Sequence, residues 1–379
     1  MKVAVVGSGQ LARMMALSGW PMGIEFRYLV QQGDSLDPIQ SLGEVVYDED
    51  YPDAEALYRA LGEPDVITVE KEAVDTERLK ALQAFCPVYP DPKMLETCRH
   101  RGLEKSWINE QGVDVAPYRR TGSRQDILEA LEVIGYPAIL KTCTGGYDGY
   151  GQWRIKTAED AAALDEDVCH LDCVLEGFVN FKREVSLIAV RNAKGDVRFY
   201  PLTENLHRSG TLLTSKAPAP NLTPELQQQA EAIGNKLLTA SNYVGVLAIE
   251  FFVTEGKGIS EDGRNGQDHL VVNEMAPRVH NSGHWTQLGC ISSQFNNHLR
   301  AITGLPIGNT QALKISGMVN LLGVDIQPTV LVDSEQQLHG YGKSLRPGRK
   351  MGHINLVADS YEALDEQLKA TLAKVYPEG

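Results

Sequence analysis

Residues 273–285 read Asn-Glu-Met-Ala-Pro-Arg-Val-His-Asn-Ser-Gly-His-Trp, which joins the end of an apolar strand to a polar, charged loop. Pro277 has no N–H to donate to a sheet, so the predicted strand ends just after Glu274. A carboxylate at a strand end can hold a hard metal ion, and Arg278 beside it can hold an anion. The stretch therefore predicts a phosphoryl-transfer or carboxyl-activation centre. The alternative is a solvated turn with a helix cap at Ser282.

Length and composition narrow the class of protein. The chain has 379 residues, which predicts two or three domains, and it is 42% hydrophobic and 23% charged, as in ordinary globular proteins. A net charge of −14 argues against a nucleic-acid partner, whose binding surface would be basic. The chain shows neither an 18-residue apolar run nor a secretory leader, and its six cysteines are scattered. We therefore expect a cytoplasmic protein with reduced cysteines that binds neither nucleic acid nor a membrane.

Residues 1–90 alternate strand and helix patterns, which predicts a parallel sheet with both faces covered. The turn Gly7-Ser-Gly resembles half of a dinucleotide fingerprint, but Ala12 stands at the third glycine position. The motif indicates only a tight turn whose amides could hold a phosphate. Glu70, at the end of the fourth predicted strand, is either a substrate contact or a solvated carboxylate.

A glycine-rich segment, Lys141-Thr-Cys-Thr-Gly-Gly-Tyr-Asp-Gly-Tyr-Gly-Gln152, follows another predicted strand. So many glycines are unsuited to a helix or strand interior and favour a hairpin loop. Its amides and threonine hydroxyls suit a phosphate lid, although the Lys-Ser/Thr and following helix of a P-loop are absent. The alternative is a plain surface hairpin, in which Tyr147 and Asp148 would have no role.

The apolar residues 244–253 predict a buried strand with one charge, Glu250. An ionised carboxylate in such surroundings is costly unless it is paired or bound to a metal. A polar link, residues 255–268, joins this strand to the one ending at Glu274, which predicts a long hairpin. Pairing the two strands would bring the two carboxylates together, where they can hold Mg²⁺ and leave ligand positions for phosphates.

Residues 173–179 and 183–190 predict two adjacent strands. Glu176 is followed by Gly177, whose backbone groups suit an adenine edge, and Glu184 lies where a ribose hydroxyl could be held. Both carboxylates have an equally simple explanation as exposed strand residues.

Two groups of cations stand out in this acidic chain. A single helix predicted at residues 94–111 places Arg101 and Lys105 four apart on one face. The loop 343–350 packs four cations into eight residues, namely Lys343, Arg346, Arg349 and Lys350. It predicts a phosphate or carboxylate clamp, with a solvated basic loop as the alternative.

Together these motifs resemble the ATP-grasp superfamily and, within it, the 5-(carboxyamino)imidazole ribonucleotide synthase family of purine biosynthesis. The resemblance covers nearly the whole chain and rests on residues 7–14, 144–152, 273–285 and 346–353. It implies a mixed α/β and α+β architecture, an ATP-grasp fold with an N-terminal Rossmann-like parallel-sheet domain and a small C-terminal domain. The implied domains are 1–95 (N-terminal), 96–172 (lid), 173–310 (catalytic) and 311–379 (C-terminal, packed on the catalytic domain).

The resemblance also implies a reaction. ATP phosphorylates bicarbonate to carboxyphosphate, and the exocyclic amine of 5-aminoimidazole ribonucleotide takes up the carboxyl group, with release of ADP and phosphate. Mg²⁺, with Mn²⁺ as a possible substitute, would serve as the metal. The enzyme would be a homodimer that passes its product to a separate mutase.

By similarity, each candidate residue acquires a role. ATP would be bound by Arg101, Lys105, Lys141, Gly146, Tyr147, Asp148, Gly149, Tyr150, Gly151, Gln152, Glu176, Gly177, Phe178, Val179, Glu184, His207, Asn273 and Glu274. The metal would be held by Glu250 and Glu274. The catalytic residues would be Arg278, His280, Asn281, Asp148 and Lys343, and the first three of these would bind bicarbonate. The ribonucleotide would be met by Gln10, Leu11, Glu70, Tyr147, Asp148, Lys343 and Arg349.

Other functions remain open at this point. Within the superfamily the alternative is a formate-using glycinamide ribonucleotide transformylase or another carboxylate–amine ligase, which would differ in the loop after Arg278. A biotin carboxylase is disfavoured because the chain is short and has no biotin-carrier segment. Outside the superfamily, the alternatives are an NAD-binding dehydrogenase domain and a nucleotide sensor without turnover. The link at residues 255–268 is longer than this family usually has, and its role is open.

Overall fold

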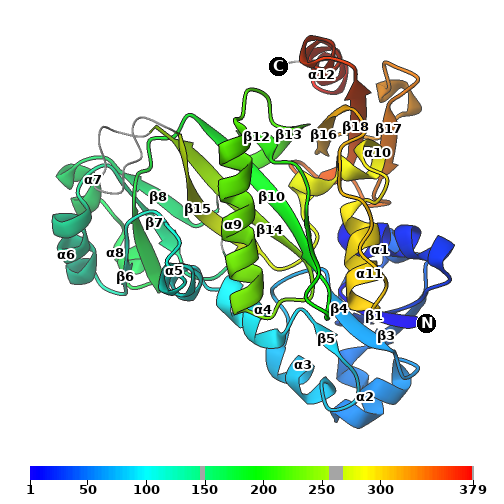
Figure 1. The fold of residues 1–379 in the computed structure, drawn as a ribbon. Coiled ribbons are helices and arrows are strands. Elements are labelled where there is room, and N and C mark those ends of the chain that lie inside the picture. The colour runs from blue at the N-terminus through cyan, green and yellow to red at the C-terminus, as the bar shows by residue number, and fades with distance from the viewer. Residues whose placement is uncertain (146–149, 256–267, 378–379) are drawn as a thin grey trace.

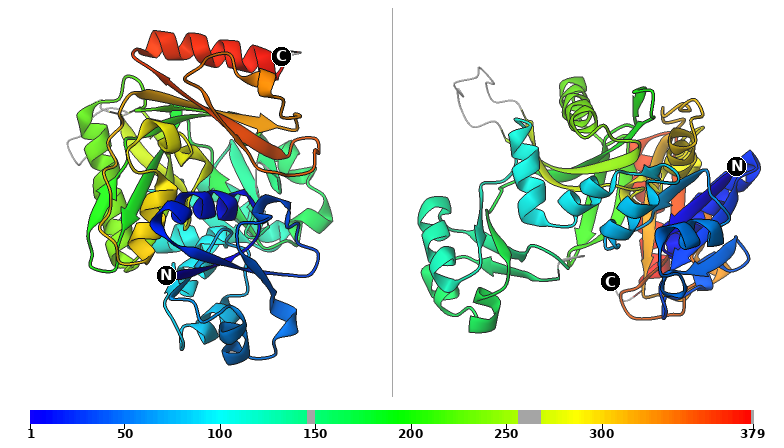
Figure 2. Two further views of the ribbon diagram at one scale, coloured as in Figure 1. Left: turned by 90° about the vertical axis from the view of Figure 1, so that its right-hand side faces the viewer. Right: turned by 90° about the horizontal axis from the view of Figure 1, so that it is seen from below.

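The computed structural model describes residues 1–145, 150–255 and 268–377, which form three β-sheets with helices between and around them (Figure 1). A five-stranded sheet lies at the N-terminus, a four-stranded sheet follows, and a nine-stranded sheet forms the body of the molecule. The four-stranded sheet projects to one side, away from the N-terminal sheet and the C-terminal strands (Figure 2).

The N-terminal sheet is entirely parallel and has the order β3-β2-β1-β4-β5. Its strands are β1 (Lys2–Val6), β2 (Glu25–Val30), β3 (Glu44–Tyr47), β4 (Val66–Val69) and β5 (Val88–Tyr89). Its helices are α1 (Gln10–Gly19), η1 (Trp20–Met22), η2 (Asp37–Ile39), η3 (Asp48–Asp50), α2 (Ala54–Ala60), α3 (Thr76–Leu82) and α4 (Pro92–Cys98). The predicted βαβ series and parallel sheet are confirmed.

The four-stranded sheet has the order β6-β9-β7-β8. Its elements are α5 (Arg101–Glu110), β6 (Tyr118–Thr121), α6 (Arg124–Ile134), β7 (Ala138–Thr142), β8 (Gln152–Ile155), α7 (Ala158–Ala162), α8 (Glu166–Cys169) and β9 (Cys173–Gly177). Ser123 caps α6 as its sequence position predicts, because its side chain accepts a hydrogen bond from the N–H of Asp126.

Two predictions are wrong in this part of the chain. The single helix expected at residues 94–111 is two helices, because the backbone of His100 is extended and its side chain caps α5 by accepting the N–H of Leu103. The strands predicted at 173–179 and 183–190 are not adjacent. The first is β9, which pairs with β6 and β7, whereas the second begins the large sheet, so the chain crosses between two sheets there.

The large sheet has the order β15-β14-β10-β12-β13-β16-β18-β17. The remaining strand, β11, pairs with residues 189–191 of β10, beyond residues 184–186 that pair with β12. Its strands are β10 (Arg183–Arg191), β11 (Val197–Phe199), β12 (Thr203–Arg208), β13 (Thr211–Ala217), β14 (Gly245–Thr254), β15 (His269–Ala276), β16 (Ile315–Leu322), β17 (Gln337–Gly340) and β18 (Lys350–Ala358). Its helices are α9 (Pro224–Ala240), η4 (Asn281–Gly283), α10 (Thr286–Gly289), α11 (Gln294–Ile302), η5 (Pro328–Val330) and α12 (Tyr361–Val375).

Helices cover both faces of this sheet, which explains its nearly continuous apolar strands. On β10, Ile188 and Val190 pack in the core that includes α11 and the N-terminal sheet. The alternate residues Leu187 and Ala189 pack in the core that includes α9. Glu250 therefore stands out in β14 because its strand is buried on both sides.

The C-terminal strands are part of the same sheet, since β16 pairs directly with β13. We retain the boundaries near residues 95, 172 and 310 as a proposal, with the addition that the last two domains share one sheet. Among the described residues, none of the helices is long and apolar enough to cross a membrane.

Candidate active site

A cleft of about 1400 Å³ opens where the three sheets meet. It brings together most of the residues predicted from sequence to bind ATP, metal and bicarbonate. Those lining it are Arg101, Lys141, Gln152, Phe178, Glu184, His207, Glu250, Asn273, Glu274, Arg278, His280 and Asn281. Residues far apart in sequence thus form one site.

The predicted carboxylate pair lies within this cleft. Glu250 and Glu274 are directly opposite in the antiparallel pairing of β14 and β15. The next pair is Phe251 with Val272, so Asn273 is the extra residue of a β-bulge. The bulge interrupts the strict alternation of side chains, and both Asn273 and Glu274 line the cleft. No sequence pattern indicated this bulge.

The negative charges of the two carboxylates repel each other, and a bound cation would offset that repulsion. Burial, and then the neighbouring charge of Glu274, raise the pKa of Glu250 to about 7. The Nε2 atom of His280 lies 3.6 Å from Glu250 Oε1. Paired strand-end carboxylates of this kind fit a hard divalent ion, because carboxylate oxygens are its preferred ligands.

Lys141, which lines the cleft, and Lys105 both pair with the buried carboxylate of Glu176. Lys141 Nζ lies 2.9 Å from Glu176 Oε2, and Lys105 Nζ lies 3.3 Å from Glu176 Oε1. Burial alone would raise the pKa of Glu176, but the two ammonium groups outweigh it and hold that pKa below its usual value. Lys105 also donates to the carbonyl of Asn273 at 3.3 Å, which ties the bulge to α5. The triad holds both lysines at the base of the site.

The predicted adenosine region is partly rearranged. His207 Nδ1 lies 2.7 Å from Glu184 Oε2. The N–H groups of Gly177 and Phe178 donate to the carbonyls of Pro117 and Pro137, so an adenine edge would have to meet other backbone groups. Val179 is half-buried and does not line the cleft.

A stacked pair of phenylalanines, missed by the sequence reasoning, also borders this region. Phe181 and Phe252 have ring centroids 4.6 Å apart, and both line the cleft. The two residues lie on separate segments, 71 positions apart, and no sequence pattern indicated their contact.

In the loop after β15, Arg278 has a partner that the sequence did not indicate. Its Nε lies 2.8 Å from Glu72 Oε1, so a residue just after β4 of the N-terminal sheet orients it. The pair joins two domains across more than half the chain length, which sequence spacing cannot reveal.

Two further residues of this loop, His280 and Asn281, also line the cleft. Burial lowers the pKa of His280 well below its usual value, so its ring is neutral. Asn281 exchanges two amide hydrogen bonds with Asn320, at 3.0 and 2.7 Å. The exchange fixes the side chain of Asn281.

A buried acid beneath β15 was also missed. Glu104, on α5, accepts a hydrogen bond from the N–H of Met275 at 2.6 Å. Burial, with the charge of Glu274, raises the pKa of Glu104 to about 8. A charged residue on the inward face of the predicted helix was the available signal.

The Gly7-Ser-Gly turn lies outside this cleft, and its amides are already occupied. The carboxylate of Glu70 accepts hydrogen bonds from the N–H groups of Gly9 and Ala12. A side chain at Gly9 would lie 2.7 Å from Glu70 Oε1, so the glycine is needed for this close approach. While Glu70 is in place, the N–H groups of Gly9 and Ala12 are already bonded and do not serve a dinucleotide pyrophosphate.

Among the described residues, three other ribonucleotide candidates, Gln10, Leu11 and Lys343, lie at this turn, and Arg349 is in the same loop as Lys343. Lys343 donates to the side-chain oxygen of Gln10, and Arg349 donates to Ser344 Oγ at 2.9 Å. Burial, then the charge of Arg349, lower the pKa of Lys343 to about 8. The side chain of Leu11 is 7% exposed and packs in the core. None of these residues lines the main cleft.

The glycine-rich segment is described only in part. Gly146, Tyr147, Asp148 and Gly149 lie outside the described residues. Gly145 and Gln152 line the cleft at the two ends of the segment, whereas Tyr150 is 73% exposed. Gly151 has a φ of +69° and would place a side chain against Thr142, which explains the glycine there.

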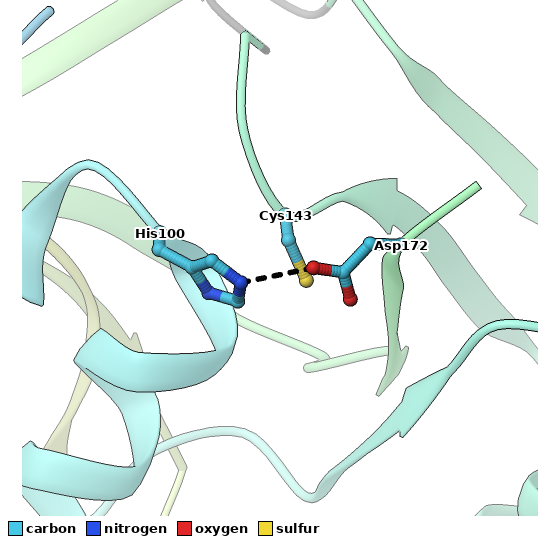
Figure 3. Close-up of side chains that lie close together, drawn as sticks. All are labelled: His100, Cys143 and Asp172. Atoms are coloured by element: carbon cyan, nitrogen blue, oxygen red, sulfur yellow. Dashed lines mark hydrogen bonds and ion pairs between the residues drawn. The ribbon is translucent and has the colours of Figure 1, made fainter.

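Within the described ranges, one group of three side chains has the spacing of a metal site, namely His100, Cys143 and Asp172 (Figure 3). Nδ1 of His100 accepts the N–H of Leu103, so the ring proton sits on Nε2, which lies 3.0 Å from Asp172 Oδ2. Arg120 donates to the same carboxylate at 3.1 Å. These bonds use the atoms a metal would need, and the cluster instead ties α5 to the four-stranded sheet.

Comparison with known proteins agrees with the fold and the site. A family model of the ATP-grasp domain matches residues 106–295. A ribonucleotide synthetase pre-ATP-grasp domain matches residues 1–99, and a phosphoribosylaminoimidazole carboxylase C-terminal domain matches residues 316–367. The chain is thus an ATP-grasp ligase, with the N-terminal parallel sheet and C-terminal domain expected from sequence.

Relatives define the family more closely. The chain is 42% identical over 358 residues to the N5-carboxyaminoimidazole ribonucleotide synthase of Pseudomonas aeruginosa, covering 94% of each chain. The crystal structure of N5-carboxyaminoimidazole ribonucleotide synthetase from Thermus thermophilus has a TM-score of 0.88 and 42% identity, covering 100% of this chain and 99% of that one. A complex of the Aspergillus clavatus synthase with ADP and 5-aminoimidazole ribonucleotide has a TM-score of 0.84 at 28% identity, covering 99% and 98%.

The chain therefore belongs to the N5-carboxyaminoimidazole ribonucleotide synthase family. This membership decides against the glycinamide ribonucleotide transformylase, biotin carboxylase and dehydrogenase alternatives.

Proposed function

We propose that this protein carboxylates 5-aminoimidazole ribonucleotide to N5-carboxyaminoimidazole ribonucleotide, using ATP and bicarbonate and releasing ADP and phosphate through carboxyphosphate. The observation that carries the proposal is one cleft in which the carboxylate pair, Lys141 and the Arg278–Asn281 loop converge. A family member of similar fold in complex with ADP and the aminoimidazole ribonucleotide supports it.

Nucleotide phosphates would lie against Arg101 and Lys141, with Lys105 behind them. Lys105 and Lys141 are already fixed by Glu176, so they need little reorganisation to stabilise charge on the transferred phosphoryl group. The glycine-rich segment from Gly146 to Gln152 would close over the phosphates and exclude water, which matters because carboxyphosphate hydrolyses readily. Glu184 and His207 would hold the ribose.

Glu250, Glu274 and the amide of Asn273 would hold Mg²⁺, or Mn²⁺ in its place. When bound, such an ion offsets the charge of the phosphates and polarises the transferred group. The fit rests on the cross-strand pairing of the two carboxylates and on the raised pKa of Glu250.

Bicarbonate would be oriented by Arg278, His280 and Asn281. Arg278 is held by Glu72 at Nε and donates from Nη1 to the carbonyl of Val279 at 3.1 Å, and its remaining N–H groups would serve an anion. Holding bicarbonate in line with the γ-phosphoryl group converts an encounter of two anions into a positioned reaction.

The ribonucleotide would bind between the glycine-rich segment and the basic loop, with Lys343 and Arg349 on its phosphate side and Gln10, Leu11 and Glu70 beside the α1 turn. Tyr147 and Asp148, which lie outside the described residues, would also contact it, as the sequence resemblance implies. Lys350 supports a connection between the two clusters, because its charge acts both on Lys343 and on Glu250.

We further propose a cytoplasmic homodimer whose product passes to a separate mutase. Six cysteines without a disulfide support a reducing compartment.

The test is the rate of ADP release by the purified protein, measured with both, either or neither of bicarbonate and the ribonucleotide. We expect release to require the ribonucleotide. Equal ADP release without it would contradict the proposal and favour a simple ATPase or a nucleotide sensor.

A further inference from the structure

A row of buried polar side chains crosses the large sheet behind the bicarbonate loop. It runs from Ser215 on β13 through Asn205 on β12 and Ser186 on β10 to Ser282, and ends at His280. The four members before His280 are at most 6% exposed. Consecutive links measure 2.8, 2.9, 2.7 and 2.9 Å. Hydrogen-bonding side chains in so dry a place are costly unless each is satisfied, which this row achieves.

The end of the row determines which ring nitrogen of His280 carries the proton. The backbone N–H of Ser282 donates to His280 Nδ1 at 3.3 Å, so Nδ1 is an acceptor. A backbone amide cannot reverse its role as a side-chain amide or hydroxyl can. An imidazole ring whose Nδ1 accepts a backbone N–H carries its one proton on Nε2, the atom that lies 3.6 Å from Glu250 Oε1.

The other links then have only one consistent direction. The Ser282 hydroxyl donates to Nδ1, and its oxygen accepts from Ser186. The Ser186 oxygen accepts from the amide of Asn205, whose own oxygen accepts from Ser215. Every proton in the row therefore points toward His280.

The strand register explains why the row ends at the carboxylates. Ser186 is directly opposite Glu250 in the pairing of β10 and β14, and Glu250 is opposite Glu274. Cross-strand neighbours share one face of a sheet. The row and the proposed metal ligands are thus built on the same strands.

We propose that Ser282, Ser186, Asn205 and Ser215 are positioning residues that hold His280 as an Nε2–H hydrogen-bond donor at the carboxylate edge of the cleft. His280 then acts by donating a hydrogen bond to an oxygen of bicarbonate or of the transferring group. It does not accept a proton at Nε2. The role in bicarbonate handling rests on the proposed function, whereas the ring tautomer does not.

The tautomer is measurable directly. In protein labelled with ¹⁵N-histidine, the two ring nitrogens of a neutral histidine differ strongly in chemical shift according to which one is protonated. His280→Gln identifies the signals by their loss. We expect wild-type His280 to be protonated on Nε2 and unprotonated on Nδ1, and the opposite assignment would overturn the proposal.

Asn205→Asp tests whether the row sets this state. An aspartate at 205 accepts from both serines, so Ser186 turns toward it and Ser282 toward Ser186, which removes the hydroxyl donor from Nδ1. We expect the His280 ring signals to shift, because Nδ1 then keeps only the backbone N–H of Ser282 as its donor. We also expect kcat for ribonucleotide-dependent ADP release to fall about tenfold while the KM for ATP changes less than about twofold, the scale of one hydrogen bond to a charged group.

Ser186→Ala provides a second variant of the row, and Ser316→Ala is its matched control. Both serines are fully buried in strands of the same sheet, but among the described residues the Ser316 hydroxyl donates only to the carbonyl of Lys314, outside the row. We expect Ser186→Ala to lower kcat by about threefold and to shift the His280 signals, as expected for one weakened neutral hydrogen bond. Ser316→Ala should do neither.

Unchanged ring signals and kcat in Asn205→Asp or, should that variant not fold, in Ser186→Ala would contradict the proposal. So would an equal response to Ser316→Ala, since that would indicate general loosening of the sheet. Failure of the proposed function is a separate outcome, in which the wild-type protein lacks ribonucleotide-dependent ADP release whatever its tautomer.

Discussion

Two regions of this molecule look alike in sequence and differ in structure. The Gly7-Ser-Gly turn and the Arg278–Asn281 loop both follow a strand and both offer donors suited to an anion. In the first, the carboxylate of Glu70 already accepts the N–H groups of Gly9 and Ala12. In the second, the charged side chains line an open cleft. A donor motif predicts a ligand site only where the rest of the chain leaves some of its donors exposed to a cleft.

The largest effect should come from the open region. Glu274→Gln keeps the size of the side chain but removes one of the two charges that would hold the metal. We expect kcat for ADP release to fall about a thousandfold or more, since metal stabilisation of the transferred charge is worth several kcal/mol. Glu132→Gln, an exposed carboxylate on α6, is the control and should retain full activity. A folded Glu274→Gln protein with full turnover would contradict the assignment.

The basic loop should show a smaller and more selective effect. Arg349→Ala removes a guanidinium fork from the proposed ribonucleotide phosphate site. We expect the KM for the aminoimidazole ribonucleotide to rise about ten- to a hundredfold, the range for a lost charged hydrogen bond, with ATP binding changed by no more than a few-fold. Nucleotide and ribonucleotide titrations of the same variant give the comparison. If ATP affinity collapsed and ribonucleotide affinity held, the loop would serve the other substrate.

The occupied region should respond in stability. Glu70→Ala leaves two N–H groups at the start of α1 without their acceptor, in a place where water has little access. We expect the free energy of unfolding to fall by about 1–3 kcal/mol in urea titrations. The exposed Glu110→Ala is the control. No loss of stability in Glu70→Ala would mean that the carboxylate is not the structural partner of this turn and is free for a ligand.

Buried histidines should make the protein sensitive to mild acid. Burial lowers the pKa of His298 to about 4, from the ordinary 6.5. The folded protein thus excludes a proton that the unfolded chain takes up as pH falls below 6.5. The stability owed to this difference is complete above pH 6.5 and decreases by about 1.4 kcal/mol per pH unit between 6.5 and 4.

Urea unfolding of wild type and His298→Gln at pH 7.0 and 5.5 isolates this contribution. We expect a smaller loss of stability on acidification in His298→Gln, whereas His170→Gln, at a residue largely exposed to solvent, should follow wild type. Parallel pH dependence in all three proteins would contradict the expectation.

Much of the site could be predicted from local patterns. A single charge in the apolar run 244–253 indicated Glu250, and the polar link after it indicated the hairpin partner. The observed register, with Glu250 opposite Glu274, confirms that pairing. Such predictions succeed where neighbouring segments of chain pair with each other.

Features that depend on distant partners could not be predicted in this way. The bulge at Asn273, the ion pair of Arg278 with Glu72 and the capping of α5 by His100 each require knowledge of backbone geometry or of another domain. The false pairing of residues 173–179 with 183–190 has the same cause. Closeness in sequence suggested adjacent strands, whereas the two belong to different sheets.

The most direct test of the proposed function follows the carbon atom of bicarbonate into the product. Protein, ATP, Mg²⁺, the aminoimidazole ribonucleotide and ¹³C-bicarbonate are mixed, and the label is observed by NMR while ADP is quantified in the same sample. We predict a new ¹³C carbamate signal on the ribonucleotide that grows in a one-to-one ratio with ADP. ADP formed in the presence of all substrates without transfer of the label to the ribonucleotide would contradict the proposed function.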